Sequence, residues 1–176
     1  NLVLTVVSGT VAIFGFHARK SGSGFELSKM GNGYCTGQDY LKISPSSQAN
    51  IVDYLKPDVV VIILGTNDYW RGHSVENYKL GILAMIDGYR TNNSNCGIIL
   101  IAPGRSGGTI AIDQYKFRDA VYEIAQAKQA EFYNMHDDWD FCSFENANQQ
   151  WLDILHVNKN GAYRIARKLF KSFMEI

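Results

Sequence analysis

The fold is decided by residues 58–68, DVVVIILGTND, which are Asp58-Val59-Val60-Val61-Ile62-Ile63-Leu64-Gly65-Thr66-Asn67-Asp68. Residues 59–64 form a continuous β-branched apolar run, which is typical of a strand buried on both faces of a parallel sheet. The glycine that follows permits a sharp turn. Asn67 is then expected just beyond the carboxyl end of the strand, where open α/β sheets bind ligands.

Strands and helices alternate on both sides of this stretch. Helices are expected at residues 46–55, 74–89 and 113–128 and from Asn158 onward, and further strands at Gly97–Ala102 and Ala130–Asn134. Alternation of this kind predicts a parallel sheet with helices on both faces. We therefore expect a three-layer α/β/α domain from residue 31 to residue 176.

Residues 1–30 have a different pattern. Short strands are expected at Leu2–Val7, Val11–Phe16 and Phe25–Lys29, separated by small turn residues. Closely spaced strands of this kind suggest antiparallel structure, as in the last strands of a β-sandwich. The sequence thus predicts a β-rich domain, residues 1–30, ahead of the α/β domain.

The charge balance excludes several partners. Seventeen basic residues balance seventeen acidic ones, which leaves no electrostatic argument for binding nucleic acid. The apolar run at residues 59–64 is far shorter than the roughly 20 residues that cross a bilayer. The three cysteines lie far apart, without the spacing of a zinc site. We expect no metal, no cofactor and no membrane span.

A second motif, Asp153-Ile154-Leu155-His156-Val157-Asn158, stands directly before the last expected helix. A carboxylate three residues ahead of a histidine can orient the imidazole, as in the Asp/His half of a catalytic triad. Asn67 can likewise donate its amide to an oxyanion. Each motif also has an ordinary interpretation. Asp153 and His156 could be surface residues that never meet, and residues 65–68 could be a simple turn, in which Asn and Asp are favoured.

Taken together, the GTND and DxxHxN motifs resemble the third and fifth blocks of the SGNH (GDSL-like) hydrolase family. The resemblance implies a flavodoxin-like sheet with strand order 2-1-3-4-5. It also implies that His156 is the general base, that Asp153 orients it, and that the Asn67 side chain is an oxyanion-hole donor. Met30-Gly31-Asn32-Gly33-Tyr34 is similar to the second block, which makes the backbone N–H of Gly33 a further donor.

Four other residues are candidates for substrate binding. Asp68, Tyr69 and Trp70 follow the GTND turn, and Arg105 follows the second buried strand. An equally good interpretation is that they belong to half-exposed loops. His136 stands among Asp137, Asp138 and Asp140, but neighbouring acidic loop residues are more often solvated than bound to metal.

The first SGNH block, Gly-Asp-Ser, is missing from the 176 residues. The nearest candidate by position, Phe14-Gly15-Phe16-His17, leaves too few residues before the next strand for a parallel crossover. Residues 2–33 resemble the end of the β-sandwich that some SGNH esterases, similar to peptidoglycan O-acetylesterases, carry between their first and second blocks. This implies that the serine lies upstream, on an N-terminal segment or separate chain, and that the sheet has a vacant central slot. We therefore expect the chain to be one piece of a cleaved or segmented protein that does not fold well alone.

The resemblance implies a serine esterase that removes small acyl groups, acetate first, from a carbohydrate or another small-acyl ester. Its substrate would be an acetylated glycan, in an extracellular, cell-surface or virion-associated setting rather than a cytoplasmic one. The alternative is a non-catalytic carbohydrate-binding or structural module that keeps the fold but has lost its serine.

Overall fold

The structure is a computed structural model that describes residues 3, 5–10, 22, 24–108, 110, 112–143 and 148–173. The chain divides into two compact units, residues 1–31 and residues 32–176. No helix in these described ranges is long and apolar enough to cross a membrane.

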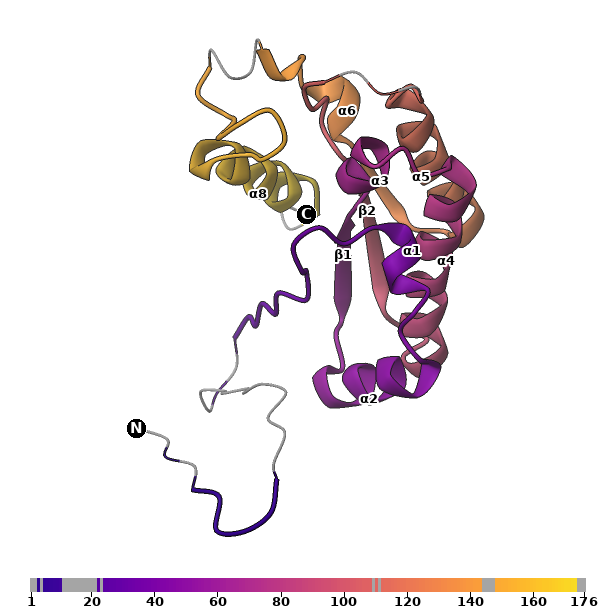
Figure 1. The fold of residues 1–176 in the computed structure, drawn as a ribbon, viewed down its shortest axis with the longest axis vertical. Coiled ribbons are helices and arrows are strands. Elements are labelled where there is room, and N and C mark those ends of the chain that lie inside the picture. Colours follow the sequence, from indigo (N-terminus) through magenta and orange to yellow (C-terminus); the bar gives the residue numbers. More distant parts are fainter. Residues whose placement is uncertain are drawn as a thin grey trace. The chain divides into compact units, whose positions relative to one another are not determined.

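The second unit is a mixed α/β domain (Figure 1). Its strands are β1 (Val59–Ile63), β2 (Gly97–Ala102) and β3 (Glu131–Asn134). Its longer helices are α2 (Pro45–Leu55), α4 (Val75–Asn92), α5 (Tyr115–Lys128) and α8 (Lys159–Phe173). Among the described residues, the short helices include α1 (Gly37–Tyr40), α3 (Thr66–Trp70) and α6 (Met135–Asp138). The predicted α/β fold with a parallel sheet is confirmed.

The sheet has the order β1-β2-β3, and both neighbouring pairs are parallel. In the register, Val61 pairs with Ile99, and Leu100 pairs with Phe132. Successive side chains of a strand alternate between the faces of the sheet. Val60, Ile62 and Leu100 therefore share one face, and Val61 and Ile99 share the other.

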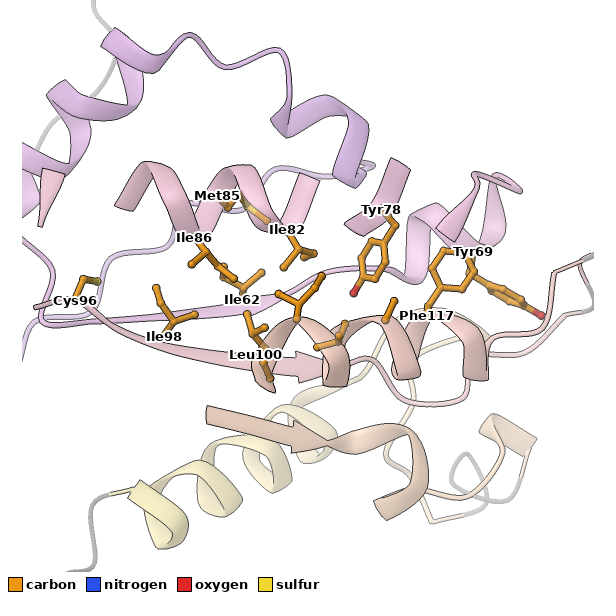
Figure 2. Close-up of a cluster of buried hydrophobic side chains, with 14 residues drawn as sticks. Ile62, Tyr69, Tyr78, Ile82, Met85, Ile86, Cys96, Ile98, Leu100 and Phe117 are labelled. Atoms are coloured by element: carbon orange, nitrogen blue, oxygen red, sulfur yellow. The ribbon is translucent and has the colours of Figure 1, made fainter. Parts of the chain in front are cut away.

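Helices α4 and α5 cover the first face, and Figure 2 shows the apolar side chains between them and the sheet. Ile62, Ile98 and Leu100 from the strands meet Ile82 and Ile86 of α4 in this cluster. The predicted helical face of residues 74–89 is thus confirmed, and so is its cap, because Ser74 Oγ accepts a hydrogen bond from the Asn77 N–H at 3.2 Å.

The second face is only partly covered. Ile99, Ile101 and Tyr133 form a second cluster, against which Ile165 and Leu169 of α8 pack. On β1, however, the side chains on this face remain 43–53% exposed, namely Val59, Val61 and Ile63. This apolar face of β1 is therefore left uncovered by the part of the chain that the structure describes.

Residues 24–31 contain no strand, so the strand predicted at Phe25–Lys29 is absent from this structure. Phe25 is 82% exposed and Leu27 is 84% exposed. A strand needs a neighbour to bond its backbone, and the residues described here provide none. The strand predicted at Val11–Phe16 lies outside the described residues. The sandwich-like nature of residues 1–30 stays a prediction.

Helices α1 and α4 meet with their backbones in close contact, and glycine makes this possible. A Cβ atom added at Gly81 would lie far inside van der Waals contact with the backbone of Gly37. A Cβ added at Gly88, on the same helix, would meet only the flexible end of the Gln48 side chain. The two glycines therefore form a matched pair for mutation.

We expect Gly81→Ala to lower the free energy of unfolding by about 1–3 kcal/mol, because the backbone of α1 must move away. Gly88→Ala should be close to neutral. The alanine gains about 1 kcal/mol of helix propensity, and the displaced Gln48 amide loses its hydrogen bond to the Met85 carbonyl. Denaturant titration of both variants measures the difference. Equal midpoints would mean that α1 is not tightly seated on α4.

Candidate active site

The GTND turn forms as predicted at the carboxyl end of β1, but it continues as helix α3 rather than as a loop. Gly65 adopts φ +124°, which side-chain-bearing residues rarely adopt, and its Cα faces the Tyr78 ring. The Tyr78 hydroxyl donates a hydrogen bond to the Leu64 carbonyl at 2.8 Å. Tyr78 therefore holds the strand end, and Gly65 turns the chain so that the next residues begin a helix.

Asn67 lies in the first turn of α3 and reaches the segment that resembles the second SGNH block. Its Nδ2 donates to the Cys35 carbonyl at 3.0 Å, two residues after Gly33. A primary amide carries two N–H donors, so a second one remains for a ligand. The structure thus brings Asn67 to the segment that follows Gly33, which is exposed. The oxyanion hole itself stays a prediction.

Asp68 lies beneath the site rather than on its surface. It is fully buried, and its Oδ1 accepts a hydrogen bond from the Gly37 N–H at 2.8 Å. Burial raises the pKa of this carboxyl, although the Gly37 N–H opposes the shift. Asp68 was predicted as a substrate-binding candidate. Its burial instead suits a residue that positions the loop carrying Gly33 and Cys35.

The DxxH motif forms a closed loop in which the two predicted catalytic side chains meet. Nδ1 of His156 lies 2.8 Å from Oδ2 and 3.0 Å from Oδ1 of Asp153. Oδ1 also accepts from the backbone N–H groups of Leu155 and His156, each at 2.7 Å. These bonds, that of His156 first, lower the pKa of Asp153 from 3.8 to about 2. The aspartate is therefore ionised at neutral pH.

This geometry assigns the imidazole tautomer. An ionised carboxylate can only accept hydrogen bonds, so Nδ1 of His156 carries a hydrogen, and in the neutral imidazole Nε2 then has the lone pair. The histidine side chain is 69% exposed, and its Nε2 makes no hydrogen bond among the described residues. The pair therefore leaves Nε2 of His156 facing solvent, and its catalytic role stays a prediction.

Backbone contacts hold the DxxH loop in shape. Trp151 and Val157 form an antiparallel bridge, and the Leu152 N–H donates to the His156 carbonyl at 2.8 Å. Asn158 then caps α8, because its Oδ1 accepts from the Gly161 N–H at 3.1 Å. The loop that carries His156 is thus anchored on a helix start, as predicted.

Residues 104–108, after β2, connect the two halves of the site. The indole of Trp70 donates to Ser106 Oγ at 3.1 Å, and the Tyr69 hydroxyl donates to the Gly108 carbonyl at 3.2 Å. On the other side, the Gly107 N–H donates to the Ile154 carbonyl at 2.7 Å. This segment therefore links α3 to the DxxH loop. No direct contact joins His156 to Asn67 or Gly33 in the described parts of the chain.

The remaining substrate-binding candidates have different surroundings. Trp70 packs over Gly108, where an added Cβ would collide with its ring. Tyr69 is 6% exposed, and Tyr69 and Arg105 both line an open cavity beside the Ile154 side of the DxxH loop. Sequence reasoning considered His136 and Asp137 of that cavity only as metal ligands, and it did not connect the polar lining residues because they lie on separate segments.

A parallel α/β sheet that carries an Asn-bearing turn and an Asp/His loop beyond its strand ends has the architecture of the SGNH hydrolases. The sequence profile of the GDSL-like lipase/acylhydrolase family matches residues 30–164. The chain belongs to this family.

Solved structures with the same fold include several esterases. A peptidoglycan O-acetylesterase is 18% identical with a TM-score of 0.69, over 81% of this chain and 44% of that one. An acetyl esterase variant with an acetate ion is 19% identical with a TM-score of 0.64, over 81% and 68%. A carbohydrate esterase family 3 protein from Talaromyces cellulolyticus is 19% identical with a TM-score of 0.57, over 81% and 70%.

At these identities the likeness shows the fold alone. The chain spans less than half of the peptidoglycan O-acetylesterase. A search of the curated proteins found no match.

Proposed function

We propose that this chain supplies the base and the oxyanion-hole donors of a serine esterase that removes small acyl groups, acetate first, from a carbohydrate. The observation that carries the proposal is the Asp153–His156 pair, whose 2.8 Å contact leaves Nε2 of the histidine unoccupied by any described residue. Membership of an acylhydrolase family and the fold shared with esterases support the reaction class.

In the proposed mechanism, a serine hydroxyl attacks the ester carbonyl while Nε2 of His156 takes its proton. The tetrahedral oxyanion accepts hydrogen bonds from the Asn67 amide, from the Gly33 N–H and from the N–H of the serine itself. Collapse of this intermediate expels the sugar alkoxide, which His156 protonates. Water, deprotonated by the same histidine, then releases the acid from the acyl-enzyme.

The serine is proposed to come from a segment outside these 176 residues, one that carries Gly-Asp-Ser. No serine hydroxyl makes a hydrogen bond with His156 in the described ranges. Ser106, near the site, already accepts from Trp70 and from Gln114, both at 3.1 Å. The uncovered apolar face of β1 is where the additional segment can pack.

The lack of a serine beside His156 among the described residues also fits one rival function. A chain that lost its serine would keep the fold and bind carbohydrate without hydrolysing it. The rival predicts that no accompanying segment carries a reactive serine.

The decisive experiment treats the native protein, with everything that co-purifies with this chain, with a fluorophosphonate probe and assays it on 4-nitrophenyl acetate. We expect turnover that the probe abolishes, and one labelled serine, found by peptide mass spectrometry in a Gly-Asp-Ser sequence. Heat-denatured protein controls for non-specific labelling. A folded native protein with neither label nor turnover would refute the esterase and favour the binding module.

A further inference from the structure

An open cavity of about 970 Å³ lies outside the carboxyl ends of β2 and β3. It lies between the segment after β2, the start of α5 and the residues around α6, and Ile154 of the DxxH loop forms part of its wall. The residues that give it chemical character are Arg105, Gln114, Tyr115, Arg118, His136 and Phe141. Neither the base nor the oxyanion donors of the proposed mechanism are among its lining residues.

A second His–Asp pair lies in this cavity. His136 is 7% exposed, and its Nδ1 lies 2.9 Å from Oδ1 of Asp137. Burial lowers the pKa of His136, against the effect of Asp137, so the imidazole is neutral. Nδ1 then donates to the carboxylate, and Nε2, which has no partner among the described residues, is an acceptor at the cavity wall.

Asp137 is the centre of a neutral cluster. It accepts hydrogen bonds from Arg118, from Arg105 at 3.4 Å and from the Asn134 amide at 2.7 Å. Arg118 also pairs with Asp119 at 2.6 Å. The two guanidinium charges are therefore balanced by two carboxylates. This balance disfavours an anionic ligand, while each guanidinium, with five N–H groups, still offers further donors.

Aromatic rings complete the lining. Phe141 is 57% exposed, and the Arg105 guanidinium lies 5.0 Å from its ring centroid. Tyr115 is 45% exposed. A cavity with exposed rings, guanidinium donors whose charge is balanced by carboxylates, and one neutral imidazole acceptor matches a ligand with apolar C–H faces and many hydroxyl groups.

The cavity is coupled to the catalytic loop. The Gly107 N–H donates to the Ile154 carbonyl at 2.7 Å, and the Cys142 N–H donates to the Arg105 carbonyl at 3.1 Å. Ile154 is followed two residues later by His156. A ligand held here therefore lies beside the loop that presents the base.

We propose that this cavity is a carbohydrate subsite, which holds an uncharged sugar residue adjacent to the acylated one. His136 Nε2 accepts a hydrogen bond from a sugar hydroxyl, Arg105 and Arg118 donate to others, and Phe141 packs against the ring. The assignment rests on the proposed function, because that function provides the acylated neighbour.

The test separates sugar binding from ester hydrolysis. Binding of three ester-free probes to the native protein is measured by isothermal titration calorimetry: chitotriose, xylotriose and, as an anionic comparison, trigalacturonate. Turnover of 4-nitrophenyl acetate, which has no sugar, is measured on the same samples. The variants are Phe141→Ala, His136→Gln and the control Tyr54→Ala, an exposed tyrosine on α2, ahead of β1 and away from the strand ends.

We expect chitotriose or xylotriose to bind, and Phe141→Ala to weaken that binding about tenfold, which corresponds to about 1.4 kcal/mol. His136→Gln should weaken it similarly, while Tyr54→Ala has no effect and acetate turnover is unchanged throughout. Phe141 is exposed, so its loss does not threaten folding. Failure of both neutral probes to bind, unweakened binding to Phe141→Ala, or tighter binding of trigalacturonate would overturn the subsite. Sugar binding that depends on Phe141, in a protein without any turnover, would instead refute the esterase function and still support the subsite.

Discussion

Asp153→Asn is expected to lower kcat on 4-nitrophenyl acetate by about 10⁴-fold in the native protein, with little change in KM. The Asp153 carboxylate accepts from Nδ1 of His156 and from two backbone N–H groups of its own loop. Asparagine is nearly the same size and retains one acceptor oxygen, which can keep the backbone bonds. Its NH₂ group would face Nδ1, however, and favour the tautomer whose proton occupies Nε2, where the base is needed.

The comparison set makes this result specific. Asp53→Asn, on the exposed side of α2, is the matched control and should retain full activity. His156→Ala should lose at least as much activity as Asp153→Asn, and the double variant should be no worse than His156→Ala, because the two side chains act as one unit. Full activity in Asp153→Asn would show that this pair is not the catalytic one.

The pH profile provides a second check on the same pair. The pKa of Asp153 is lowered to about 2, so the stabilisation that its negative charge gives to the DxxH loop and the His156 ring is complete above the ordinary value of 3.8. That stabilisation is lost only as the pH falls from 3.8 toward 2. Protonation of Asp153 therefore cannot cause a decline in activity between pH 5 and pH 8. A kcat profile on 4-nitrophenyl acetate that falls with a midpoint between 3.8 and 2 is the expected sign of Asp153 protonation.

The parts of the fold that were predictable are those that local sequence determines. The apolar run before Gly65 needed only its β-branched composition to indicate a buried strand, and Ser74 needed only its place ahead of an amphipathic stretch to indicate a cap. Both features depend on residues that are close in sequence, as the hydrogen bond from the Asn77 N–H to Ser74 Oγ illustrates.

Features that depend on contacts distant in sequence were missed or assigned a different role. Helix α3 is five residues long, too short to be predicted from periodicity, and its Asp68 bonds Gly37 across 31 positions of sequence. Asp68 therefore looked like a polar loop residue when it is a buried one. The cavity that holds Arg105, His136 and Phe141 is built from segments whose separate patterns indicate only polar loops.

Val61→Asp is expected to abolish esterase activity in the native protein while leaving the 176-residue chain by itself folded to the same degree as wild type. Val61 is 43% exposed on the uncovered face of β1, so a carboxylate there reaches water when the chain is alone. If the serine-bearing segment packs on this face, the same carboxylate becomes buried without a partner. That burial costs several kcal/mol, enough to prevent the segment from binding.

Ile62 lies one residue away on the opposite face, where it is 7% exposed beneath α4 and α5. Ile62→Asp should therefore unfold the chain whether or not the other segment is present, and Val61→Thr, which adds no charge, should assemble and turn over normally. Size-exclusion chromatography and 4-nitrophenyl acetate turnover distinguish the three variants. A fully active Val61→Asp protein would mean that the face of β1 stays open in the working enzyme, and that the serine reaches His156 from a different direction.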